Sequence, residues 1–114
     1  MKRIMIVAAL LALSGCSSTA NDLRTTHPFL SGDSSKSPQV FIGCVLNNWN
    51  EKNTIAPISA QPLENGYTAQ INDMTRGVVM LIDVMPTKDN SGGEFKFYKK
   101  RNMEYYERSV ISCK

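Results

Sequence analysis

The sequence is poor in histidine and cysteine, and it lacks an apolar run long enough to cross a bilayer. Its single histidine, His27, precedes Pro28 in a polar stretch, so the rest of the chain offers no base for a Ser-His-Asp or Cys-His arrangement. Its three cysteines are widely spaced with no histidine beside them, which makes a poor zinc set. The longest apolar run, 4–13, has about ten residues, whereas a spanning helix needs about 20. We therefore expect no cofactor and no metal.

A large excess of charge of either sign is also missing. The chain has 13 Lys and Arg residues against 10 Asp and Glu residues, and two of the basic residues, Lys2 and Arg3, lie at its very start. Taking those 2 from the 13 leaves 11 basic against 10 acidic side chains in the remainder. A balance this even gives little support to a nucleic-acid partner, and none is expected.

Residues 1–15 have the composition of a secretory signal peptide. Lys2 and Arg3 form a basic start, the apolar run follows, and the small residues Ser14 and Gly15 end it. Such a segment is removed from the mature protein and belongs outside the fold.

The end of that segment, Leu13-Ser14-Gly15-Cys16, resembles the lipobox of bacterial lipoproteins. The resemblance implies that the Cys16 thiol takes a diacylglycerol, that the signal is cleaved before Cys16, and that the new amine is acylated. Several acyl chains would hold the protein durably, since each buried methylene contributes about 0.8 kcal/mol. Ser17 stands where an aspartate would resemble the inner-membrane retention signal, so the resemblance favours the outer membrane, facing the periplasm. The alternative is an ordinary signal peptide in which Cys16 has no role.

The mature chain would have 99 residues, the 114 of the sequence less the first 15, which suits one small domain and a tether. Residues 16–37 are dominated by small polar residues without a helical or strand period. We interpret them as the lipidated N-terminus and a flexible tether. Residues 38–114 are then a small periplasmic domain.

Once Cys16 is assigned to lipid, Cys44 and Cys113 remain as an even pair in an oxidising compartment. A disulfide is the expected outcome. It would close a loop of roughly 70 residues, for which the chain-entropy model gives about 4 kcal/mol. Metal ligation and a reactive thiol are the alternatives.

Ser37 followed by Pro38 is a helix-start signal, with Ser37 as the N-cap. Apolar residues from Val40 to Trp49 then follow a spacing of three and four, which predicts a helix that the asparagines between 47 and 53 bring to an end. A buried strand over 40–46 is the competing interpretation, because that run is rich in β-forming residues. Trp49 is predicted to pack in the core rather than to serve as an exposed binding aromatic.

Three strands are predicted after a loop over 54–66. Residues 67–72 alternate between apolar and polar, which indicates a half-buried strand. Residues 78–85 are apolar at nearly every position except Asp83, so this strand should be central or covered on both faces. Residues 94–99 alternate again after a turn over 89–93, and the last two strands are predicted to form a hairpin.

A final helix is predicted to run to Cys113, capped by Asn102, with Glu104 and Arg108 spaced for a surface ion pair. The sum is a small two-layer α+β domain, helix–three-stranded antiparallel sheet–helix, with a disulfide joining the helices. The arrangement looks like one in small exported proteobacterial proteins of uncharacterised function. The resemblance is loose, carries no known activity, and involves Cys44, Trp49, Gly66, Tyr67, Tyr98 and Cys113.

No residues form a convincing catalytic set. Asp83 would be a site candidate if it were buried, and an outward position is the alternative. Glu104 and Glu107, three apart on one helix, are interpreted as solvated surface rather than as a glycosidase pair. One basic and aromatic cluster is a candidate binding patch, with ordinary solubilising charge as the alternative; it comprises Lys96, Tyr98, Lys99, Lys100, Arg101, Tyr105 and Arg108.

The anchor, the small stapled domain and the missing catalytic set predict a non-enzymatic lipoprotein that binds another envelope component. Its role would be that of an accessory, an inhibitor or an immunity factor, since a tethered anchor raises the effective concentration of a binder near the membrane. The expected partners are the membrane, through the lipid, and an envelope protein. A small envelope or cell-wall hydrolase using Asp83 or the helix acids, and a structural envelope lipoprotein, are the alternatives.

Overall fold

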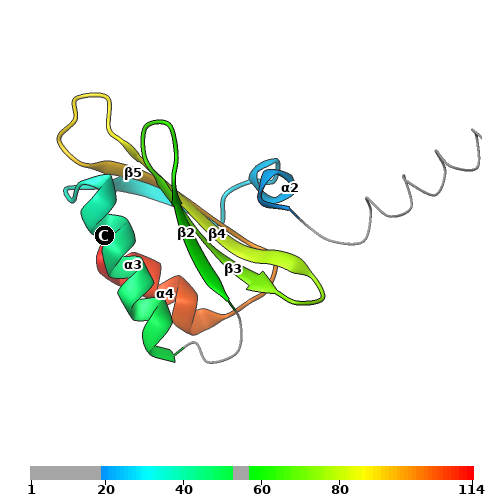
Figure 1. The fold of residues 1–114 in the computed structure, drawn as a ribbon. Coiled ribbons are helices and arrows are strands. Elements are labelled where there is room, and N and C mark those ends of the chain that lie inside the picture. The colour runs from blue at the N-terminus through cyan, green and yellow to red at the C-terminus, as the bar shows by residue number, and fades with distance from the viewer. Residues whose placement is uncertain (1–18, 53–56) are drawn as a thin grey trace, which may run out of the picture.

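The computed structural model describes residues 19–52 and 57–114, which form one α+β unit (Figure 1). The predicted signal peptide, Cys16, Ser17 and Asn53 lie outside the described residues. In chain order the elements are α2 (Ala20–Arg24), β1 (Leu30–Ser34), α3 (Pro38–Lys52), β2 (Ile58–Pro62), β3 (Tyr67–Asp73), β4 (Gly77–Pro86), β5 (Gly93–Lys99) and α4 (Glu104–Cys113).

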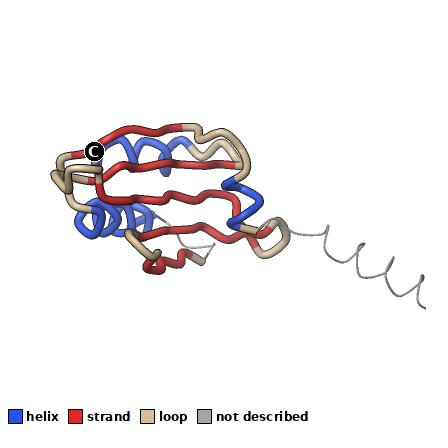
Figure 2. Tube along the Cα trace, turned by 90° about the horizontal axis from the view of Figure 1, so that it is seen from above, coloured by secondary structure: helices blue, strands red, loops and turns tan. Residues whose placement is uncertain are grey.

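The strands form one antiparallel sheet in the order β1-β5-β4-β3-β2 (Figure 2). The three predicted strands, β3, β4 and β5, are confirmed. The β4–β5 hairpin pairs Met80 with Lys99 at one end and Pro86 with Gly93 at the other. The apolar strand β4 is central, as its composition predicted, because residues buried on both faces need a neighbour on each side.

The number of strands is wrong in the prediction: the sheet has five rather than three, and the two missed strands are its edges. β1 lies in the segment interpreted as a tether and β2 in the segment interpreted as a loop. Neither has a regular apolar alternation, since β1 reads Leu-Ser-Gly-Asp-Ser and β2 ends in a proline. They are held by backbone pairing with stronger neighbours, Leu30 opposite Phe97 and Ile58 opposite Ile71. Strand preference of this kind depends on the neighbour and not on local sequence.

The flexible-tether interpretation of 16–37 is therefore wrong for the part that the structure describes. α2 begins with a capping box, in which the Thr19 hydroxyl accepts the N–H of Asp22 and the Asp22 carboxylate accepts the N–H of Thr19. A helix of five residues is too short to be stable alone, so α2 depends on its packing against the sheet. β1 also lies close to the β4–β5 loop, because a Cβ added to Gly92 would sit 1.9 Å from the Ser34 carbonyl oxygen.

The helix prediction for 38–49 is confirmed, and the strand alternative is wrong. Ser37 caps α3 as expected, since its hydroxyl accepts the N–H of Val40 at 3.4 Å. The helix ends at Lys52, within the asparagine-rich stretch 47–53 that was predicted to end it. α4 is also confirmed, but its N-cap is Met103 rather than Asn102, and no side chain caps the helix there. The Met103 N–H instead donates to the Glu107 carboxylate at 3.0 Å.

α3 and α4 cover one face of the sheet and enclose the main core (Figure 1). Trp49 is fully buried there, as predicted, and its indole N–H donates to the Tyr106 carbonyl oxygen at 3.1 Å. The Phe41 ring on α3 stacks on the Phe95 ring of β5 with centroids 5.1 Å apart. These contacts pack the layer of helices onto the sheet.

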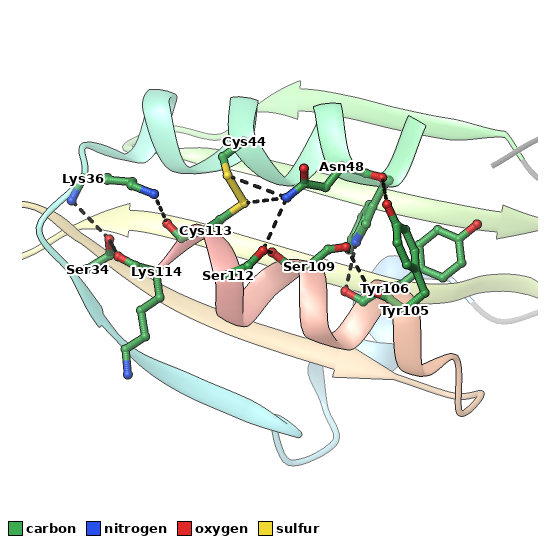
Figure 3. Close-up of a disulfide and its surroundings, with 11 residues drawn as sticks. Ser34, Lys36, Cys44, Asn48, Tyr105, Tyr106, Ser109, Ser112, Cys113 and Lys114 are labelled. Atoms are coloured by element: carbon green, nitrogen blue, oxygen red, sulfur yellow. Dashed lines mark hydrogen bonds between the residues drawn. A yellow bond between two sulfur atoms is a disulfide. The ribbon is translucent and has the colours of Figure 1, made fainter. Parts of the chain in front are cut away.

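The predicted disulfide between Cys44 and Cys113 is confirmed, and it joins α3 to α4 (Figure 3). The Asn48 side-chain amide donates to the Cys113 sulfur at 3.3 Å and, more weakly, to the Cys44 sulfur at 3.9 Å. Near the same end of the helices, the Lys36 ammonium donates to the Cys113 carbonyl oxygen at 2.6 Å. The C-terminal turn is therefore fastened by both covalent and polar contacts.

The opposite face of the sheet carries α2 and a second, smaller apolar cluster. In this cluster Leu23 packs against Val78, Leu81 and Tyr98, with Ala20 at its margin. Because α2 has only five residues, it covers only part of this face, and no other helix of residues 19–52 and 57–114 lies on it (Figure 2).

Candidate functional site

The structure does not bring the predicted basic-aromatic patch together as one surface. Side chains of consecutive strand residues point to opposite faces, so Lys96 and Tyr98 lie on the α2 face and Lys99 on the helix face. Lys99 pairs with Glu107 of α4 at 2.7 Å and lies over the Phe29 ring at 3.4 Å from its centroid. Because the Lys99 ammonium is already paired with Glu107, it fastens β5 to α4 and is poorly placed to bind a partner.

The other patch residues are also distributed over different contacts. The Tyr105 hydroxyl donates to the Asn48 carbonyl oxygen at 2.9 Å, which links α4 to α3. Arg101 lies 3.4 Å from the Asp73 carboxylate at the end of β3. Arg108 and Glu104 form the predicted exposed pair at 3.8 Å. Tyr105 and Arg108 border a shallow polar groove of about 410 Å³ between the helices, apart from Lys96 and Tyr98.

Lys96 and Tyr98 instead line a cavity of about 390 Å³ beside α2. We call this the α2 cavity. Its floor and rim comprise Arg24, Leu63, Asp83, Met85, Glu94, Lys96 and Tyr98. Two of these residues belong to the predicted patch and a third is Asp83, the acid singled out from the sequence. Strand pairing explains their assembly, because Asp83 is directly opposite Lys96 and Met85 is opposite Glu94.

The strongest polar contact of the α2 cavity is a two-point ion pair between Arg24 and Asp83. The Arg24 Nε lies 2.7 Å from Oδ2 of Asp83, and its Nη2 lies 2.8 Å from Oδ1. The same guanidinium donates to the Thr68 hydroxyl at 3.2 Å. The hydrogen bond to Asp83 raises the pKa of Arg24 above its ordinary value, against a smaller opposing effect of burial. Asp83 is thus neither a freely exposed acid nor a buried unpaired one.

The sequence could have indicated Arg24 only indirectly. The Thr19-x-x-Asp22 pattern is a capping-box signal that marks a helix start. The segment that follows has too few apolar residues to support a helix on periodicity alone. Arg24 becomes part of a site only because α2 folds back onto β4, which is a contact between residues 59 apart in the chain.

The α2 cavity has the chemistry of a binding surface. Its apolar floor is formed by Leu63, Met85 and Tyr98, and charges of both signs surround it: Arg24 and Lys96 against Asp83 and Glu94. Such a surface matches an apolar side chain flanked by charged or polar groups. His27 is exposed in the segment before β1 and does not line the cavity.

A third cavity, of about 480 Å³, lies between the start of α3 and the β2–β3 turn and is bordered by three prolines, Pro38, Pro62 and Pro86. It has one acidic residue, Glu64, and no basic residue on its border. Within residues 19–52 and 57–114, no three His, Cys, Asp or Glu side chains are grouped so that they could hold a metal ion. In the same described part of the chain no helix is long and apolar enough to cross a membrane.

Comparisons with protein-family models, with curated proteins and with solved structures give no match to this chain.

Proposed function

We propose that this protein is a lipoprotein, anchored to the outer membrane through Cys16, whose periplasmic domain binds a protein of the envelope without catalysing a reaction. The sequence supports the anchor through the lipobox-like stretch that ends at Cys16. The observation that carries the binding role is the α2 cavity, an incompletely covered part of the sheet with an apolar floor and a charged rim.

The occupant that fits the α2 cavity best is a segment of a protein partner that presents one apolar side chain between charged groups. Lys96 and Glu94 are exposed on the rim and stand on the same face of β5, two residues apart. They can therefore pair with an acidic and a basic group of one segment, while the apolar side chain enters toward Met85. Rim charges of this kind contribute mainly to specificity and to the rate of association.

A photo-reactive amino acid introduced at Lys96 of the lipidated protein tests this role in cells. Irradiation should give one dominant adduct with an envelope protein. The same amino acid at Asn47, which is exposed on α3, is the matched control and should not give that adduct. A Cys16→Ala version, expected to be mislocalised, should lose the adduct. If positions 96 and 47 give the same set of weak adducts, the α2 cavity is not the binding site.

Metabolic labelling with a palmitate analogue tests the anchor separately. The wild-type protein should carry the label, and Cys16→Ala should not. Lack of label on the wild-type protein would refute the anchor without bearing on the cavity.

A hydrolase that uses Asp83 is a second candidate, because Asp83 and Glu94 both line the α2 cavity. Against it, both oxygens of Asp83 already accept hydrogen bonds from Arg24, and this pairing hinders the approach of the carboxylate to a substrate. Degradation of purified peptidoglycan by the wild-type protein, lost in Asp83→Asn, would favour the enzyme over the binder.

A further inference from the structure

The lipid anchor proposed above, on which this inference rests, restricts the orientation of the domain on the membrane. Cys16 and Thr19, the first described residue, are three residues apart. A chain covers at most about 3.5 Å per residue, so three residues reach no further than about 10 Å. The start of α2 must therefore remain close to the bilayer surface whenever Cys16 is inserted.

α2 cannot compensate by moving as an independent tether, because it is packed onto the sheet. Leu23 is 3% exposed, and Arg24 is paired with Asp83 at two points. Ala20 and Leu23 pack with Val78, near the start of β4 and next to the β3–β4 turn. Figures 1 and 2 both place α2 toward the end of the sheet at which the β3–β4 turn lies. This end of the domain is thus the one that the anchor brings to the bilayer.

The β3–β4 turn presents an apolar side chain at its tip. Met74 is 92% exposed, far more than any other exposed large apolar side chain in the described part of the chain. The turn is well ordered around it, since one carboxylate oxygen of Asp73 accepts the N–H groups of Thr75 and Arg76 and the Thr75 hydroxyl. An apolar side chain held outward at the membrane-proximal end is suited to enter the lipid headgroup region.

Three basic residues lie at the same end of the sheet as this tip. Arg76 is exposed in the same turn, and the segment after β5 brings Lys100 and Arg101 to the same end of the sheet. The Lys100 N–H donates to the Val79 carbonyl oxygen, and Arg101 lies beside the Asp73 carboxylate.

Several acids of this end take part in contacts of the fold, whereas Glu104 at the start of α4 is exposed. Asp73 holds the turn, Asp22 caps α2 and Glu107 pairs with Lys99. Beside the exposed Met74, the basic residues Arg76, Lys100 and Arg101 are also exposed, and their charge complements an anionic lipid surface.

We propose that this membrane tip, defined by Met74, Arg76, Lys100 and Arg101, rests on the anionic phospholipid surface, with Met74 entering the headgroup region. The orientation has a consequence for the α2 cavity. Asp83 and Met85 lie further along β4, on the side of α2 away from the turn, so the cavity is directed away from the bilayer and toward a partner. The anchored domain therefore holds the α2 cavity in one orientation relative to the bilayer and does not rotate freely about its anchor.

The test uses the mature chain from Cys16 onward, coupled through the Cys16 thiol to a maleimide-headgroup lipid in vesicles. Cys44 and Cys113 are bridged and do not compete for the maleimide. The vesicles contain phosphatidylethanolamine with phosphatidylglycerol and a brominated lipid that quenches tryptophan fluorescence. Trp49, the one native tryptophan, is buried and provides a constant background.

In the Met74→Trp variant the added emission should shift to the blue and be quenched by the brominated lipid. The matched control is Lys88→Trp, at an exposed position in the loop at the opposite end of β4, and its emission should be unshifted and unquenched. Adding Arg76→Glu to Met74→Trp should weaken the quenching by about fivefold or more, since each cation near an anionic surface contributes a factor of this size. Equal quenching in the Met74→Trp and Lys88→Trp variants, or none in either, would overturn the orientation.

This test and the test of the anchor fail independently. Because the coupling to lipid is chemical, unquenched Met74→Trp emission refutes the membrane tip even if Cys16 is acylated in cells. Conversely, absence of the palmitate label in cells refutes the anchor even if the tip binds vesicles.

Discussion

The ion pair between Arg24 and Asp83 should contribute about 2 kcal/mol to the attachment of α2 to the sheet. This energy lies between two limits: exposed ion pairs contribute about 0–1 kcal/mol, and breaking a buried ion pair costs about 3–5 kcal/mol. Here the side chains are 28% and 15% exposed and the geometry is two-pronged, which places the pair between those limits.

A double-mutant cycle measures this energy directly. Arg24→Met keeps the aliphatic stem and removes the charge, Asp83→Asn keeps the shape, and the double variant closes the cycle. Urea unfolding can be followed by the fluorescence of Trp49, which lies in the other core and does not touch the pair. A coupling energy below about 0.5 kcal/mol would show that the pair is only a surface contact and would refute the reasoning.

The same variants should affect α2 before they affect the rest of the fold. A five-residue helix has little stability of its own, so loss of its ion pair should open it locally. Hydrogen exchange at Leu23 and Thr26 should accelerate in Arg24→Met, whereas exchange in β4 should change little. Uniform acceleration across the sheet would mean that α2 is an integral part of the main core and not a locally attached cover.

Three further predictions concern the scaffold. Replacing both bridged cysteines, Cys44→Ala and Cys113→Ala, should lower the free energy of unfolding by about 4 kcal/mol, which urea titration with and without reductant measures. A loss below about 1 kcal/mol would contradict the view that the disulfide constrains the unfolded chain. Gly92→Ala should destabilise the protein by about 3 kcal/mol, because the added Cβ would meet a backbone oxygen of β1. Gly43→Ala, where the added Cβ has nothing within 4 Å, should instead stabilise α3 by about 0.5–1 kcal/mol, and thermal unfolding distinguishes the two variants. Asp89 accepts hydrogen bonds from neighbouring hydroxyls that lower its pKa from 3.8 to about 2, so the stabilisation they give should be complete above pH 3.8 and be lost as the pH falls through 2. An NMR titration that gives Asp89 a pKa near 3.8 would contradict this.

Several features could be predicted from the sequence because they depend on short-range patterns. The apolar run of β4 identified the centre of the sheet, and Ser37 with Pro38 identified the start of α3. The two domain cysteines identified the bridge between α3 and α4, since an even pair in an exported chain has few alternatives. The local assignments that failed were caps and ends, such as Met103 in place of Asn102, where the energetic differences between adjacent positions are small.

The candidate site was less predictable, because the residues of the patch were chosen for being close in sequence. Lys96 and Lys99 are three apart on β5, and the strand places them on opposite faces of the sheet. Arg24, the residue that completes the α2 cavity, lies in a polar segment whose composition is that of a linker. Its role arises only when α2 packs across β4.

The sequence by itself determined the α+β class, the central hairpin, the two long helices and the disulfide, because periodicity, caps and cysteine number act within a few residues of the chain or through a single possible partner. It also supplied the lipobox-like stretch on which the proposed anchor rests. Only the tertiary structure decided the two edge strands, the folding of α2 onto the sheet and the assembly of the α2 cavity. These features depend on backbone pairing and side-chain contacts between distant segments, and a weakly patterned segment such as β1 acquires its structure from the neighbour that it pairs with.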